Sequence, residues 1–138
     1  MKESNLQSSF TKYMKQHANE HFKSSVCYEL KITKTGSLPF SRIEPHQITA
    51  LMDSKFDVLC HKISDMSLGF KPFDGFIAIN ASAYIGICFY KPRASKIVYM
   101  IDIVDMKNEI EESRMSKQAR KSLTEKRAKE LATLVIDL

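Results

Sequence analysis

The chain has 138 residues, of which 43% are hydrophobic and 27% are charged. This length suits one domain with one core, and this composition excludes wholesale disorder. The formal net charge is +5, and a positive surface attracts phosphate backbones, so the charge favours nucleic acid as a partner.

Neither a membrane segment nor a zinc site is expected. No apolar run approaches the length of a bilayer span, and the N-terminus has no apolar signal core. The three cysteines, Cys27, Cys60 and Cys88, form no Cys-x-x-Cys pair, and the four histidines do not supply zinc-like spacings. We therefore expect reduced core cysteines in a cytoplasmic protein with no small-molecule cofactor.

The first part of the chain predicts two helices around a strand. Apolar residues recur at helical spacing over residues 5–22, and strict alternation over Val26–Thr33 predicts a half-buried strand. A turn-rich segment, residues 34–39, leads to Pro45, which suits the first turn of a helix that runs to about Phe56.

The second part predicts strands and then a basic helix. After a short strand at residues 58–63 come three β-rich runs, residues 73–79, 83–90 and 97–103. The middle run is apolar on both faces, which indicates a central strand. Beyond about residue 105 the chain becomes charged and helical, with a basic helix over residues 116–134. This order predicts one α/β domain over residues 1–138, with a central mixed β-sheet flanked by helices.

Three side chains of this pattern could support metal-dependent phosphodiester hydrolysis. Glu29 and Lys31 lie two residues apart on a predicted strand and so point to the same face, and Asp74 stands at the mouth of another strand. Mg²⁺ accepts one or two carboxylates with waters, so Glu29, Asp74 and the backbone carbonyl of Leu30 could hold it, with Mn²⁺ as a substitute. The alternative is that Glu29 and Lys31 form a solvated strand face and Asp74 a turn.

Three consecutive segments resemble those of a known nuclease family. They are Tyr28–Lys34, Ser37–Phe40 and His46–Ile48, and they are similar to the RecU-type and archaeal-type Holliday junction resolvases of the PD-(D/E)XK nuclease superfamily. The resemblance covers residues 28–52 and, more loosely, 71–90. It implies a restriction-endonuclease-like fold and a homodimeric, magnesium-dependent endonuclease that acts on branched or duplex DNA.

The same resemblance suggests roles for residues beyond the strand. Gln47 would orient water or phosphate, and His46 would either touch DNA or simply cap the helix. Glu3 is the candidate for a helix glutamate that joins the site in the family, or else a first-turn acid that the helix dipole favours. Asp65 is interpreted as a loop cap rather than a second acid of the site.

The chain departs from the family at one position. The family places a metal-binding aspartate on the strand before Glu-x-Lys, whereas the first aspartate of this chain is Asp53. We therefore assign that role to Asp74, within Lys71-Pro72-Phe73-Asp74, so that it would reach the site from another strand.

Several basic residues are candidates for contact with the DNA backbone, and two other functions stay open. The candidates are Lys34, Arg42, Lys71, Lys117, Arg120 and Lys121. The first alternative function is another PD-(D/E)XK-type nuclease acting on duplex, ends or flaps. The second is a non-catalytic nucleic-acid-binding module of the same fold.

Overall fold

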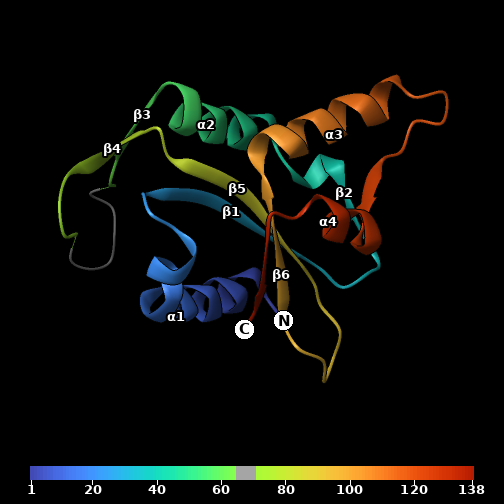
Figure 1. The fold of residues 1–138 in the computed structure, drawn as a ribbon, viewed down its shortest axis with the longest axis horizontal. Helices are drawn as coiled ribbons and strands as arrows, with labels where there is room; N and C mark the ends of the chain where they lie inside the picture. Colours follow the sequence, from blue (N-terminus) through green and yellow to red (C-terminus); the bar gives the residue numbers. More distant parts are fainter. Residues whose placement is uncertain (65–70) are drawn as a thin grey trace.

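Figure 1 shows the computed structural model, which describes residues 1–64 and 71–138. Asp65 therefore lies outside the described residues. The fold is α/β with a mixed central sheet flanked by helices, as predicted. Its elements are α1 (Glu3–His21), β1 (Val26–Thr33), β2 (Ser37–Pro39), η1 (Phe40–Arg42), α2 (Pro45–Phe56), β3 (Val58–Lys62), β4 (Gly75–Ile79), β5 (Ser82–Phe89), β6 (Ile97–Asp102), α3 (Ile103–Met115), β7 (Ser122–Thr124), α4 (Glu125–Leu131) and β8 (Leu134–Asp137).

The central sheet has the strand order β1-β5-β6-β8. β1 runs parallel to β5, whereas β6 pairs antiparallel with both β5 and β8. The crossover between β1 and β5 contains α2, as a parallel connection requires. β5 therefore has a strand on each side, which confirms that its run of apolar residues on both faces marks a central strand.

Helix α1 covers one face of the sheet (Figure 1). Leu6 and Phe10 of α1 are fully buried and belong to one apolar cluster with Leu30 and Met100 of the sheet. Gly86 permits this packing, because a Cβ at that position would lie 2.7 Å from a Leu30 methyl and 2.9 Å from the Met100 sulfur. Both neighbours would have to move to admit any larger residue.

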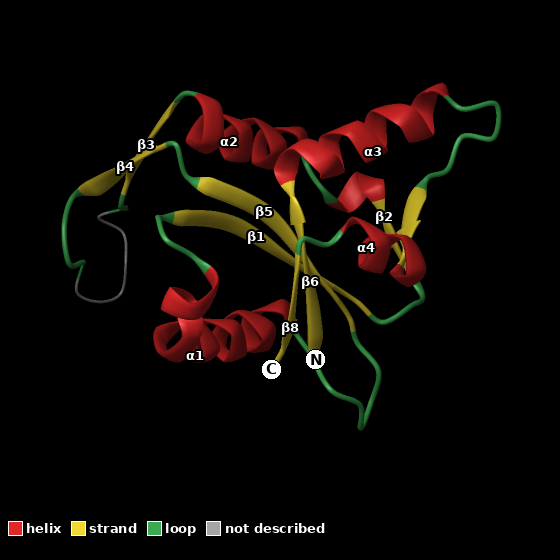
Figure 2. Ribbon diagram, viewed as in Figure 1, coloured by secondary structure: helices red, strands yellow, loops and turns green. Residues whose placement is uncertain are grey.

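Helices α2 and α3 cover the opposite face (Figure 2). Leu51 of α2 and Ile110 of α3 share a second apolar cluster with Ile85 and Ile87 of β5. The parallel register sets Glu29 beside Ile85 and Lys31 beside Ile87. Because successive strand residues alternate between faces, Glu29 and Lys31 share one face, as predicted, and that face is the α2 side of the sheet.

The strands β3 and β4 form a separate two-stranded hairpin that extends beyond the central sheet (Figure 1). Its apolar residues Val58, Ile77 and Ile79 are exposed, as is Phe56 at the end of α2. The hairpin matters for the site because it carries Phe76 toward β1 and α2.

The predicted basic helix over residues 116–134 is wrong in its extent, because only Glu125–Leu131 of this range form a helix, α4. Residues 122–124 form β7, which pairs with β2 and buries Leu123 against the core. Thr124 then caps α4, since its hydroxyl accepts a hydrogen bond from the Arg127 backbone N–H at 3.2 Å. Leu134 begins β8, which completes the edge of the sheet. Pairing partners distant in the sequence therefore overrode a charged composition typical of a helix.

The expectation of core cysteines holds for one residue of three. Cys88 is buried and Cys27 is half-buried, but Cys60, on the β3–β4 hairpin, is exposed. All three are free thiols. Across the described ranges, no helix combines the length and hydropathy needed to cross a bilayer.

Candidate active site

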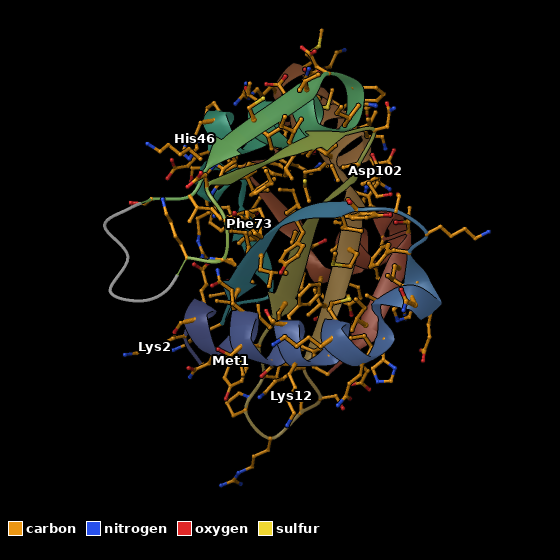
Figure 3. All side chains as sticks on the ribbon, turned by 90° about the vertical axis from the view of Figure 1, so that its left-hand side faces the viewer. Met1, Lys2, Lys12, His46, Phe73 and Asp102 are labelled. Carbon is orange, nitrogen blue, oxygen red and sulfur yellow. The ribbon has the colours of Figure 1, made fainter. Side chains whose placement is uncertain are left out.

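A hollow of about 490 Å³ opens between β1, the start of α2 and the β3–β4 hairpin. Glu29 from β1, His46 and Gln47 from α2, and Phe76 from β4 all line it. Figure 3 looks onto the side that carries the hairpin and labels His46 at the start of α2. Three predicted site residues from two separate elements are therefore brought to one surface depression.

Glu29 is the centre of the polar contacts in this hollow. The Lys31 Nζ lies 3.0 Å from the Glu29 Oε1, and the Gln47 Nε2 donates a hydrogen bond to the same oxygen at 2.8 Å. The Lys31 side chain is 10% exposed and the Glu29 side chain 33%. Among the described residues, the Glu29 Oε2 makes no hydrogen bond, so it can still accept a ligand.

The amide of Gln47 is oriented at both of its ends. Gln47 is the third residue of α2, which begins at Pro45, and its Oε1 accepts a hydrogen bond from the Glu44 backbone N–H at 3.0 Å. This contact is one half of a capping box, in which an N3 side chain satisfies the N-cap N–H. With its oxygen committed to the helix, Gln47 directs its NH₂ to Glu29.

His46 and Glu3 lie outside this set of contacts. His46 is exposed and its Nδ1 lies 3.1 Å from a Glu44 carboxylate oxygen. Glu3 accepts a hydrogen bond from the Arg42 Nη2 at 2.8 Å, and the Arg42 Nη1 donates to the backbone oxygen of Ile32. The structure thus uses Glu3 and Arg42 together to tie the start of α1 to the edge of β1.

The carbonyl of Leu30 points to the edge of the sheet, but Leu30 as a whole is only 3% exposed. The Thr33 oxygen accepts from the Tyr90 N–H on the β5 side, whereas the Ile32 oxygen accepts from Arg42 on the other side. Carbonyls two residues apart along a strand point the same way. Leu30 therefore directs its oxygen to the outer edge of β1, which is the end strand of the sheet.

Asp74 is not brought into the Glu29 hollow. It precedes β4, where its side chain is 95% exposed and lies 3.3 Å from the Lys71 Nζ. It lines a separate hollow together with His61 and Lys62 of the hairpin. Figure 3 labels its neighbour Phe73 in this turn. Its role as a metal ligand stays a prediction.

The donors in the Glu29 hollow fit a magnesium ion that keeps most of its water. Within residues 1–64 and 71–138, no group of three or more His, Cys, Asp or Glu side chains could hold a metal ion. Mg²⁺ nevertheless binds to one or two carboxylates and retains several waters. The free Glu29 oxygen meets part of that smaller requirement, whereas Leu30 is buried and does not line the hollow, so its carbonyl stays a predicted ligand.

The predicted DNA-binding residues have different surroundings. Arg42 and Lys71 are engaged with Glu3 and Asp74. Lys34 follows β1, and Lys117 is exposed in the segment after α3. Arg120 and Lys121 line a groove beside α2 and α3, together with Lys107 and Arg114, which the sequence reasoning missed. The seven-residue spacing of Lys107 and Arg114, two turns of one helix face, was the available signal.

A cluster of ion pairs, Glu109 and Glu130 around Arg127, lies between α3 and α4. Glu109 is 3% exposed, and Arg127 donates to both of its oxygens, Nε to Oε1 at 3.1 Å and Nη2 to Oε2 at 2.9 Å. The hydrogen bonds to Glu109 and Glu130 raise the pKa of Arg127 above its ordinary value. This bidentate pair fastens α4 to α3.

Comparison with known proteins gives no match to this chain among family models, curated protein sequences or solved structures. Function must therefore be inferred from the side chains of the hollow and from their geometry.

Proposed function

We propose that this chain is a magnesium-dependent DNA endonuclease that cuts branched DNA such as a four-way junction. The observation that carries the proposal is the contact of Lys31 and Gln47 with a single oxygen of Glu29, which with Gln47 lines an open hollow. A carboxylate, an ammonium and an amide donor at one surface are the groups that metal-assisted phosphodiester hydrolysis uses.

Glu29 would hold the ion through its second oxygen, with the Leu30 carbonyl as the other ligand from β1. Asp74 is the predicted second carboxylate, and Mn²⁺ would substitute for Mg²⁺. When bound, the ion lowers the pKa of a coordinated water and neutralises charge that develops on the phosphate.

Lys31 would orient the attacking water or donate to a phosphate oxygen. Its stem is buried on the strand, so the ammonium has few positions available besides the one beside Glu29. Gln47 would hold the Glu29 carboxylate in the orientation that presents Oε2 to the hollow, because its own amide is fixed by the α2 cap. The Lys31 and Gln47 side chains would therefore already be in position when a substrate binds.

The choice of a junction and of a homodimer rests on the resemblance to the resolvases. Two symmetric cuts in a four-way junction suit a two-fold enzyme. The position of Asp74 outside the Glu29 hollow favours one alternative, a module that binds nucleic acid without cutting it, because one carboxylate holds a metal ion less tightly than two.

The test is cleavage of a labelled four-way junction, a duplex and a flap by wild type, Glu29→Gln and Lys31→Met with Mg²⁺. We expect each substitution to lower the junction cleavage rate by about 100-fold or more, the usual cost of removing one group that stabilises transition-state charge. Junction binding in EDTA should persist. Lys12→Met, a lysine-to-methionine change on α1 across the sheet, is the matched control and should cut at the wild-type rate.

An unchanged cleavage rate in Lys31→Met would refute the proposed site. Pure wild-type protein that binds the junction but never cuts it with Mg²⁺ or Mn²⁺ would instead identify the non-catalytic module. Faster cutting of the duplex or flap than of the junction would retain the nuclease and replace its substrate.

A further inference from the structure

A groove of about 700 Å³ lies on the other side of α2 from the Glu29 hollow. Its walls are η1 and the start of α2 on one side, and α3 with residues 120–121 on the other. Pro45, Ile48 and Thr49 of α2 face this groove, whereas His46 and Gln47 face the hollow. One helix therefore separates the two depressions.

The groove carries an excess of positive charge. Lys107, Arg114, Arg120 and Lys121 line it, against a single carboxylate, Glu111. Arg120 has only a long contact of 3.6 Å with Glu109. Within the described parts of the chain, no ion pair involves the side chains of the other three cations.

Two arginines outside the groove are, by contrast, neutralised by neighbouring carboxylates. Arg127 is bound by Glu109 and Glu130, and Arg42 is bound by Glu3. Four cations that face one groove, with a single long ion pair among them, are complementary to a polyanion, since each phosphate that they bind releases condensed counterions.

Tertiary contacts hold the walls of this groove in place. The Phe40 backbone N–H donates to the Lys121 oxygen at 3.0 Å, and Leu38 of β2 pairs with Leu123 of β7. The segment that bears Arg120 and Lys121 is thereby attached beside η1. The cations belong to a built surface rather than to a free charged tail.

The width of α2 sets the spacing between groove and hollow. An α-helix with its side chains is about 10–12 Å across. A DNA strand advances about 3.4 Å per nucleotide along the duplex axis, so the groove lies about three nucleotides from the Glu29 hollow. One strand could occupy both depressions by crossing the first turns of α2.

We propose that this groove binds the phosphate backbone of the DNA whose scissile phosphate lies at Glu29, about three nucleotides further along. The inference takes its partner from the proposed function and adds a second contact region. Lys107 and Arg114 on α3 are its new DNA-binding residues, and Arg120 and Lys121 complete the set.

The test compares Lys107→Gln/Arg114→Gln with Lys12→Gln/Lys15→Gln, which removes the same charge from α1 on the other face of the sheet. Fluorescence anisotropy with a labelled four-way junction in EDTA gives Kd between 50 and 200 mM salt. Each lost phosphate contact makes the slope of log K against log salt shallower by about 0.9. For Lys107→Gln/Arg114→Gln, the groove pair, we expect a slope shallower by about two and binding about tenfold weaker. For Lys12→Gln/Lys15→Gln, the α1 pair, we expect a slope and a Kd close to those of wild type.

Equal losses in the two pairs would overturn the inference, because they would show a response to net charge alone. Tighter binding of a poly-glutamate peptide than of DNA would also overturn it, in favour of an acidic protein partner. The outcome is independent of catalysis. If wild type never cuts DNA but only the groove pair shows a shallower salt dependence, the proposed function is wrong and the groove is still a DNA-binding site. If wild type cuts DNA and the salt dependence of the groove pair is unchanged, only the groove inference is wrong.

Discussion

Glu29 on β1 and Glu109 on α3 both contact basic side chains, but only one of them faces an open hollow. Both oxygens of Glu109 are bound by Arg127, and the side chain is 3% exposed. The two partners of Glu29 meet at one oxygen, and the side chain is 33% exposed. A buried carboxylate with both oxygens hydrogen-bonded stabilises the fold, whereas a carboxylate held by one oxygen at a surface can accept a ligand.

The largest expected effect comes from making the same substitution at both acids. Glu109→Gln should lower the free energy of unfolding by about 3 kcal/mol, near the lower limit for breaking a buried ion pair, because Arg127 is partly exposed. Glu29→Gln should cost about 1 kcal/mol, since its amide oxygen can still accept from the Gln47 amide. Urea unfolding of the two variants measures the difference. Equal costs would show that Glu29 is as structural as Glu109.

Substitutions at Gln47 can separate a structural role from a role at Glu29, because its side chain contacts both the α2 cap and Glu29. Gln47→Ala removes both contacts and should cost about 1 kcal/mol in stability, the usual value of a helix cap. Gln47→Glu keeps an acceptor for the Glu44 N–H but loses the donor to Glu29 and places a like charge beside it. We therefore expect it to be more stable than Gln47→Ala and to cleave DNA more slowly.

The measurement for this pair combines thermal unfolding with junction cleavage. If Gln47→Glu instead lowers the midpoint temperature as much as Gln47→Ala, the cap contact carries no stability. If the two variants cleave at equal rates, orientation of Glu29 by Gln47 has no part in the reaction.

The smallest effect concerns a third acid, Glu125, which accepts from the Lys91 ammonium at 2.9 Å and the Tyr99 hydroxyl at 3.2 Å. Burial and the Glu125 charge raise the pKa of Tyr99, and the hydrogen bond and charge of Glu125 raise the pKa of Lys91. A raised pKa means that the folded state holds its proton more tightly than the unfolded state. The resulting stability is present below about pH 10, the ordinary tyrosine value, and is lost as the pH rises above it.

Urea unfolding at pH 8, 10 and 11 would measure this loss. Glu125→Gln should flatten the alkaline decline, and Tyr99→Phe should remove the tyrosine part of it. A decline that is equally steep in Glu125→Gln would assign the alkaline sensitivity to other groups.

The parts of the fold that were predicted correctly are those with a strong local pattern. The alternation of Val26–Thr33 predicted β1 with its bounds, and Pro45 marked the start of α2. The same alternation placed Glu29 and Lys31 on one face. Local periodicity suffices to place these elements because it acts over a few residues, although β1, predicted to be half-buried, is buried on both faces from Leu30 to Thr33.

The parts that were missed depend on partners far away in the sequence. β7 and β8 exist because β2 and β6 offer edges to pair with, and the basic composition of that region predicted a helix instead. The groove joins η1 and α2 to α3 and to residues 120–121, so no local window contains it. Asp74 was assigned by a motif, but the hairpin carries it to a hollow of its own.

By itself, the sequence determined the α/β class, the Glu29-Leu30-Lys31 strand and the helix that begins beside it, because alternation, helical spacing and a proline act over a few residues. Only the tertiary structure decided which carboxylates have both oxygens hydrogen-bonded. Arg127 closes both oxygens of Glu109 across 18 residues, and Gln47 reaches one oxygen of Glu29 across the same separation. That difference depends on which elements pack together, since packing determines which donors come within hydrogen-bond distance of each oxygen.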